Sequence, residues 1–148
     1  MLRKILIPVL ITFLLCGCSG APKETSPENT EYLAASEIGI SGYSCITGES
    51  EIQQVNGLTV RAFSHRIYNP NNDYIGTLTA TVTGSLSGSD PQITDIRAEL
   101  SDQQIDGLSV SVHTSENTGT VVLYLNQMSI CHFQYRMRND GQVTYLQS

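Results

Sequence analysis

The sequence predicts an all-β domain built as an antiparallel meander of about eight strands. From Gly42 onward, apolar and polar residues alternate with a period of two, which is the period of a half-buried strand. Short clusters of Gly, Asn, Asp and Ser separate these segments, and no apolar stripe of helical period is long enough for a helix. We therefore expect either a sandwich of two packed sheets or a flattened barrel.

Residues 74–83 and 128–138 show the alternation most clearly. The predicted core positions of the first segment are Gly76, Leu78, Ala80 and Val82. Its other face carries Thr77, Thr79, Thr81 and Thr83. We interpret this threonine row as the solvent side of a strand, with a flat recognition surface as the alternative. The predicted core positions of the second segment are Cys131, Phe133, Tyr135 and Met137.

Two further segments complete the predicted core. Thr94, Ile96, Ala98 and Leu100 alternate and are expected to share one buried face. Residues 121–125 carry apolar side chains on both faces of the predicted strand, so this strand is expected to be buried on both sides. Only residues 30–40 could hold a helical turn, and a short one.

Three dipeptides predict tight hairpins, because they accept positive φ at the centre of a turn: Asn56-Gly57, Asp106-Gly107 and Asp140-Gly141. The first two lie inside similar octapeptides, QQVNGLTV at residues 53–60 and QQIDGLSV at residues 103–110. We interpret the similarity as two hairpins that use the same turn chemistry, with an ancient duplication as the alternative.

The first eighteen residues carry the most specific signal. Arg3 and Lys4 precede eleven uncharged residues, a run too short to cross a membrane and typical of a secretory signal. The run ends at Leu15, and Leu15-Cys16-Gly17-Cys18 resembles the lipobox of bacterial lipoproteins. The resemblance implies that signal peptidase II cleaves before Cys18 and that Cys18 carries a diacylglyceryl group. The alternative is an ordinary secretory signal with two incidental cysteines.

The predicted organisation has three parts. Residues 1–17 are a lipoprotein signal peptide, residues 18–30 are a lipidated N-terminus with a flexible tether, and residues 31–148 form a single β-sandwich-like domain. Residues 19–30 contain no apolar side chain larger than Pro and cannot pay the entropy of folding. The resemblance places the protein on a cell membrane or outer membrane, facing outside the cytoplasm.

The charge balance restricts the partners. The full chain has 8 basic and 14 acidic residues, and loss of Arg3 and Lys4 leaves 6 basic against 14 acidic residues, a net charge of −8 instead of −6. Such a chain repels nucleic acid and anionic headgroups. We therefore expect no nucleic-acid binding and membrane contact through the lipid alone.

Cys45 and Cys131 remain after processing. In an exported chain they predict one disulfide, with two separately buried thiols as the alternative. Immunoglobulin domains have a core Trp and a Tyr two residues before the second Cys. This chain has no Trp and has Ser129 at that position, so we expect a sandwich that is immunoglobulin-like only in its layering.

No catalytic motif is present in the sequence. His65, His113 and His132 lack the spacing of zinc ligands and are expected to be polar strand residues on the solvent side. The alternative is that they converge with Met128 or Met137 on a copper ion. We expect no metal and no cofactor beyond the acyl lipid on Cys18.

One loop is the candidate binding element. It consists of Tyr68, Asn69, Pro70, Asn71, Asn72, Asp73 and Tyr74. Tyrosines that flank a polar turn are typical of binding loops. The loop also resembles the Asn-Pro-Thr-Thr-Gly-Tyr loop of chagasin-type cysteine protease inhibitors at Asn69, Pro70 and Tyr74, although Asn71-Asn72-Asp73 replaces the Thr-Thr-Gly centre.

The leading hypothesis is a small lipid-anchored envelope protein with a non-catalytic binding or accessory β-domain. Its partner would be an envelope protein or a wall polymer. One alternative, implied by the resemblance, is an exported protease inhibitor that acts through the 68–74 loop. Another is a hydrolase or metal-binding protein with a site that is not visible in the sequence.

Overall fold

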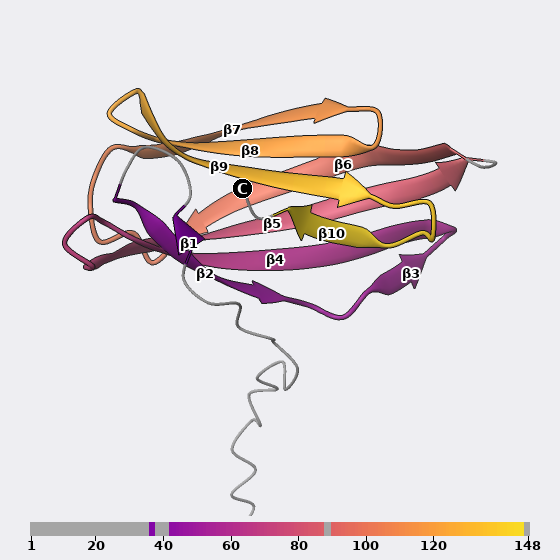
Figure 1. Ribbon diagram of the computed structural model, residues 1–148, viewed down its shortest axis with the longest axis horizontal. Coiled ribbons are helices and arrows are strands. Elements are labelled where there is room, and N and C mark those ends of the chain that lie inside the picture. The colour runs from indigo at the N-terminus through magenta and orange to yellow at the C-terminus, as the bar shows by residue number, and fades with distance from the viewer. Residues whose placement is uncertain (1–35, 38–41, 88–89, 147–148) are drawn as a thin grey trace, which may run out of the picture.

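The computed structural model describes residues 36–37, 42–87 and 90–146, and its described residues form ten strands in two antiparallel sheets (Figure 1). The sheets pack face to face and do not close into a barrel, so the sandwich is confirmed. No described residue belongs to a helix long and apolar enough to span a membrane. The predicted signal peptide, Cys18 and the tether lie outside the described residues.

Five strands of the six-stranded sheet follow the order β1-β2-β4-β5-β6. The sixth, β3, pairs with residues 58–60 of β4, whereas β2 pairs with residues 63–68. The strands of this sheet are β1 (Ser36–Glu37), β2 (Ser44–Glu49), β3 (Gln53–Val55), β4 (Leu58–Tyr68), β5 (Tyr74–Ser87) and β6 (Asp90–Ser101). The four-stranded sheet has the order β10-β9-β8-β7. Its strands are β7 (Leu108–Ser115), β8 (Thr118–Leu125), β9 (Met128–Met137) and β10 (Val143–Leu146).

The core lies between the two sheets, where the predicted alternation is confirmed. Leu78, Ala80 and Val82 on β5 are fully buried, and so are all four predicted core residues of β9. The threonines of β5 lie half-buried on the outer face. The expectation that residues 121–125 are buried on both sides is wrong, because Val122 and Tyr124 are half-exposed on the outer face of β8.

A β-bulge overturns the expected face of Thr94. Thr83 pairs with Asp95 and Gly84 pairs with Ile93, so Thr94 has no partner of its own in the ladder. Thr94 is exposed, and its hydroxyl donates a hydrogen bond to the Thr83 carbonyl at 3.2 Å. The extra residue lets Ile93 and Ile96 both point into the core although they are three residues apart.

The predicted turns have mixed outcomes. Asn56 (φ 52°) and Gly57 (φ 78°) form the tight β3–β4 turn as expected. Gly141 (φ 80°) lies in the longer β9–β10 hairpin loop. The expected hairpin at Asp106-Gly107 is wrong, because residues 102–107 carry the chain from β6 in one sheet to β7 in the other.

The β8–β9 turn was not expected from the sequence. Asn126 (φ 50°) and Gln127 (φ 69°) close this two-residue turn without glycine, between the paired residues Leu125 and Met128. The expected helical turn in residues 30–40 is also not found where the structure describes that range. Ser36 and Glu37 form strand β1 instead and pair with Cys45 and Ser44 of β2.

Candidate functional site

The 68–74 loop joins β4 to β5 at the left end of the sandwich in Figure 1. The β6–β7 connection and the β8–β9 turn lie at the same end and are tied to each other and to β5. Gln104 N–H donates to the Ile75 carbonyl at 3.0 Å, and Asn126 N–H donates to the Gly107 carbonyl at 3.0 Å. These hydrogen bonds therefore connect the segments at the end of the fold that carries the 68–74 loop.

Asn69 organises the loop from within. Its Oδ1 accepts hydrogen bonds from the backbone N–H groups of Asn71 and Asp73, both at 2.9 Å. Its backbone N–H donates to the Asp73 carbonyl at 2.9 Å, and its carbonyl accepts from Asn72 N–H at 2.8 Å. Asn72 adopts φ 65°, a left-handed conformation that Asn tolerates better than most residues. The side chain and backbone of Asn69 thus together make the hydrogen bonds that shape the turn.

The two tyrosines brace the base of the loop. The rings of Tyr68 and Tyr74 meet edge to face with centroids 5.9 Å apart. The Tyr74 hydroxyl lies 2.7 Å from Thr77 Oγ1, and the Arg66 guanidinium lies 5.4 Å from the Tyr74 ring centroid. These contacts hold the tyrosines half-buried.

Gly42 supports the loop from the side. It adopts φ 101°, and a Cβ at this position would approach Pro70 Cβ to 2.9 Å. Only glycine allows this close contact with the loop. The tip residues Pro70, Asn71, Asn72 and Asp73 remain exposed. The result is a preformed tip that offers amide and carboxylate hydrogen bonds, a surface suited to binding rather than to bond cleavage.

The core contains a chain of buried polar groups that joins the two sheets. His65 Nδ1 on β4 lies 2.8 Å from Thr47 Oγ1 on β2, and His65 Nε2 lies 2.8 Å from the Tyr135 hydroxyl on β9. The expectation that His65 faces solvent is wrong, since it is 0% exposed. Its two hydrogen bonds satisfy both ring nitrogens and allow a neutral imidazole in the core.

Cys45 on β2 and Cys131 on β9 are both fully buried in this region. The pKa of Cys131 is raised to about 12, mainly by burial and also by the charge interaction with Cys45. A nucleophilic thiol needs a lowered pKa, so this environment opposes thiol catalysis. The structure brings the predicted disulfide partners into one core region on opposite sheets, and the bond itself stays a prediction.

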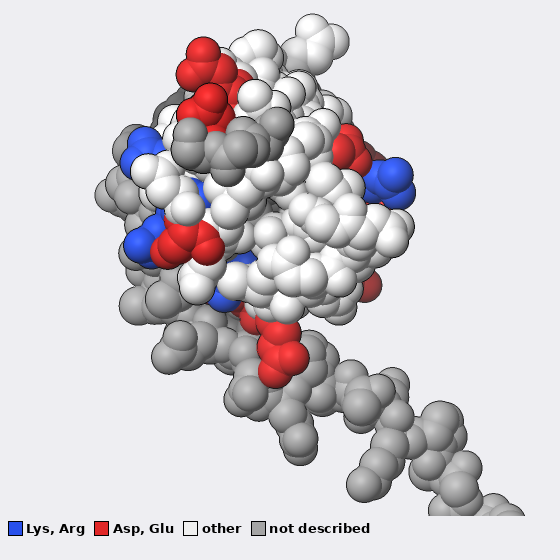
Figure 2. Space-filling model, turned by 90° about the vertical axis from the view of Figure 1, so that its right-hand side faces the viewer, with Lys and Arg blue, Asp and Glu red and all other residues white. Residues whose placement is uncertain are grey.

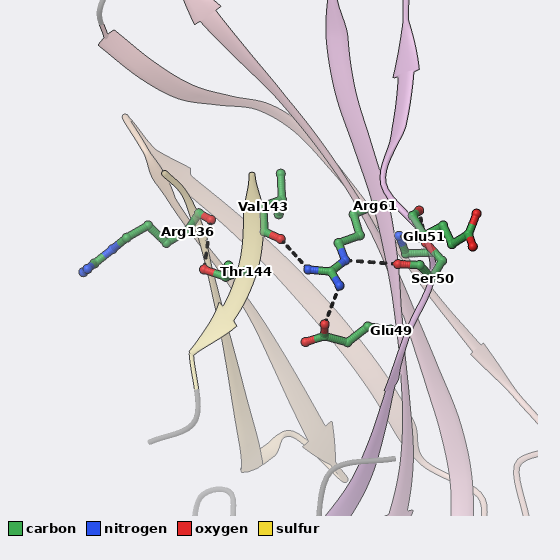
Figure 3. Close-up of polar contacts among 8 residues, drawn as sticks. Glu49, Ser50, Glu51, Arg61, Arg136, Val143 and Thr144 are labelled. Carbon is green, nitrogen blue, oxygen red and sulfur yellow. Dashed lines mark hydrogen bonds and ion pairs between the residues drawn. The ribbon is translucent and has the colours of Figure 1, made fainter. Parts of the chain in front are cut away.

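Arg61 makes a second connection between the sheets (Figure 3). Its Nη2 lies 2.6 Å from Glu49 Oε2, its Nε donates to the Ser50 carbonyl at 3.1 Å, and its Nη1 donates to the Val143 carbonyl at 3.0 Å. The guanidinium also lies 5.5 Å from the Phe63 ring centroid. Because β2, β4 and β10 all contribute, Arg61 holds the sandwich together rather than facing a ligand.

The three histidines are not brought together. His65 is buried, whereas His113 on β7 and His132 on β9 are exposed on the outer face, as expected. His132 Nε2 lies 2.7 Å from Ser129 Oγ. Within the described ranges, no three His, Cys, Asp or Glu side chains are close enough together to hold a metal ion.

The opposite end of the sandwich faces the viewer in Figure 2 and has two open depressions. Their volumes are about 490 and 420 Å³, and Asn117 and Asn139 line both. Acidic and basic side chains are scattered round this end in Figure 2, and its centre is uncharged. Arg138 and Asp140, which both line the first depression, form an ion pair of 3.1 Å.

Comparison with known proteins found no matching family model, no similar curated protein and no similar solved structure.

Proposed function

We propose that this protein is a lipid-anchored lipoprotein of the cell envelope, and that its β-sandwich binds a partner through the 68–74 loop without catalysis. The anchor part of the proposal rests on Leu15-Cys16-Gly17-Cys18 and stays a prediction. The binding part rests on one observation, the exposed tip whose backbone is hydrogen-bonded to the side chain of Asn69. A preformed loop loses little entropy on binding, so a small contact area can give useful affinity.

The proposed partner is an envelope protein or wall polymer rather than nucleic acid, because the chain is acidic. The tip itself contributes one carboxylate, Asp73, and three uncharged residues. Its chemistry fits a ligand that presents hydrogen-bond donors, such as backbone amides, hydroxyl groups or an amine.

In-cell photo-cross-linking tests this proposal. A photoreactive residue at position 71 should give a discrete cross-linked product, whereas one at the exposed position 139 at the opposite end should not. Partner and domain are then purified, and Asn69→Ala should weaken their binding at least tenfold because it removes the hydrogen bonds that fix the tip. Asn139→Ala is the matched control. Equal products from both positions, or binding that Asn69→Ala leaves unchanged, would contradict the proposal.

The three-residue match to chagasin-type inhibitors favours one second candidate, a cysteine protease inhibitor that uses the same loop. Incubation of the purified protein with papain-like proteases separates the two functions. Inhibition at micromolar concentration that is lost in Asn69→Ala would favour the inhibitor. Full protease activity at that concentration would exclude it.

A further inference from the structure

The two depressions at the end of the sandwich opposite the 68–74 loop carry opposite charges. The first, of about 490 Å³, is lined by the guanidinium groups of Arg136 and Arg138 and by the carboxylate of Asp140. The second, of about 420 Å³, is lined by two carboxylates, those of Asp90 and Glu116. Among the described residues that line the second, none is basic. We call the first the basic depression and the second the acidic depression.

The two depressions adjoin because the same two segments border both. Asn117 in the β7–β8 turn and Asn139 in the β9–β10 loop line both depressions. The Ile93 N–H donates to the Glu116 carbonyl at 2.7 Å, and the Met137 N–H donates to the Asn117 carbonyl at 2.8 Å. These two hydrogen bonds hold the turn between the start of β6 and the end of β9. A ligand that reaches from one depression into the other therefore passes two side-chain amides.

Three of the five charged side chains are exposed and are not engaged in an ion pair with any described residue. These three are Arg136, Asp90 and Glu116, whereas Arg138 and Asp140 pair with each other at 3.1 Å. Figure 3 shows one dashed line at Arg136, which ends on its backbone carbonyl. Its guanidinium extends away from the other labelled residues. The basic depression thus offers a cation to a ligand, and the acidic depression offers two carboxylates.

Glu116 keeps an unfavourable backbone conformation at this site. It adopts φ 49° in the turn between the paired residues Ser115 and Thr118. Gly, Asn and Asp tolerate this left-handed region, whereas a Glu in it lowers the stability of the fold. The β8–β9 turn has Asn126 at the corresponding position, with φ 50°. The carboxylate of Glu116 therefore occupies a position that the turn itself does not favour, and a role in binding would explain this.

We propose that this end of the sandwich binds a short peptide that has both a free amino terminus and a free carboxyl terminus. Arg136 receives the carboxylate through its N–H donors, and Asp90 and Glu116 receive the ammonium group. The side-chain amides of Asn117 and Asn139 each offer donors and an acceptor, which match the C=O and N–H groups of a peptide bond. Such a peptide has no net charge, so the acidic domain does not repel it.

Titration of the purified protein with tri-alanine, followed by NMR chemical shifts, tests this site. Tri-alanine should cause saturable shifts of the Asn117 and Asn139 signals at millimolar concentration. Tri-alanine that is acetylated at its amino terminus lacks the ammonium group, and tri-alanine amide lacks the carboxylate. Each blocked peptide should bind about threefold more weakly, because each loses one exposed charge pair.

Variants without one kind of charge should lose selectivity for one end of the peptide only. Arg136→Gln should bind tri-alanine about threefold more weakly and should no longer prefer it to tri-alanine amide. A double variant with Asp90→Asn and Glu116→Asn should instead no longer prefer it to the acetylated peptide. Asn tolerates φ 49° better than Glu, so the double variant should unfold at no lower temperature than the wild type. Arg97→Gln on β6 is the control and should bind as the wild type does.

Three results would overturn the peptide site. The first is tri-alanine that causes no saturable shift at millimolar concentration. The second is equal binding of tri-alanine and both blocked peptides. The third is selectivity that Arg136→Gln and the double variant leave unchanged. The site is separate from the 68–74 loop and does not rest on the function proposed for it. A tripeptide adds too little mass to give a cross-linked protein product at position 139, so the two proposals fail separately.

Discussion

Lowering the pH from 6.5 to about 3 should destabilise the folded domain by about 4 kcal/mol through His65 alone. Burial lowers the pKa of His65 from 6.5 to about 3, because the core cannot solvate an imidazolium. Thr47 and the Tyr135 hydroxyl satisfy the neutral ring, and His65 packs against Phe133 with ring centroids 4.3 Å apart. The folded protein therefore resists protonation of this residue.

The direction of the effect follows from where the proton binds. Above pH 6.5 the imidazole is neutral in both the folded and the unfolded protein, so His65 causes no dependence on pH. Between pH 6.5 and about 3 the unfolded chain binds a proton that the folded protein does not, so the free energy of unfolding falls as the pH falls. Below about pH 3 His65 is protonated in both the folded and the unfolded protein, and its contribution to the free energy of unfolding is fully lost.

Urea unfolding of the wild type and His65→Gln at several pH values between 7 and 3 measures this loss. Gln has no titratable group, so the variant should lose about 4 kcal/mol less than the wild type on acidification, although it should be less stable than the wild type at pH 7. The control is His132→Gln on the exposed face of β9, which should follow the wild type. Parallel curves for the wild type and His65→Gln would contradict the buried neutral imidazole.

Oxidation of Cys45 and Cys131 to a disulfide should stabilise the domain by about 4 kcal/mol in the chain-entropy model. The bond would join β2 to β9 and so link the two sheets, in the same region of the core as the polar chain through His65. The bond would form by exchange with an external disulfide, which takes up two electrons and two protons from the Cys45 and Cys131 thiols and leaves as two thiols. Intact-mass analysis under denaturing conditions should then show a gain of two protons on reduction.

Substitution of the cysteines separates the bond from two independent thiols. If the bond is present, Cys45→Ala, Cys131→Ala and the double variant should all lose a similar amount of stability, because either substitution removes the same bond. If the thiols are separate, the double variant should lose more stability than either single variant. A mass that reduction leaves unchanged, together with a larger loss in the double variant than in either single variant, would refute the disulfide.

The sequence predicted the faces of β5 and β9 because their alternation is regular and local. On β4 it was wrong for His65, and it made no prediction for Thr59 and Arg61. All three point inward together with Phe63. Each of these polar residues has one hydrogen-bond partner at least seventy residues away in the chain, namely Gly141, Val143 and Tyr135 respectively. A single sequence shows the cost of burying such residues but not the distant groups that offset it.

The paired octapeptides show the same limit for turns. Asn56-Gly57 and Asp106-Gly107 both place glycine at positive φ, yet one closes a hairpin and the other joins two sheets. Local turn chemistry sets the backbone angles, whereas core packing decides which sheet the next strand enters. The 68–74 loop was predictable because Asn69, Pro70 and Asn72 determine its turn locally.

Mass analysis of the N-terminal peptide from the membrane fraction tests most directly that this is a lipid-anchored exported domain. We predict a first residue Cys18 that carries a diacylglyceryl thioether, in the wild type and in Cys16→Ser. Cys18→Ser should lose the lipid and either stay unprocessed or leave the membrane. A wild-type chain that is found in the cytosol, begins at Met1 and carries no lipid would contradict the assignment.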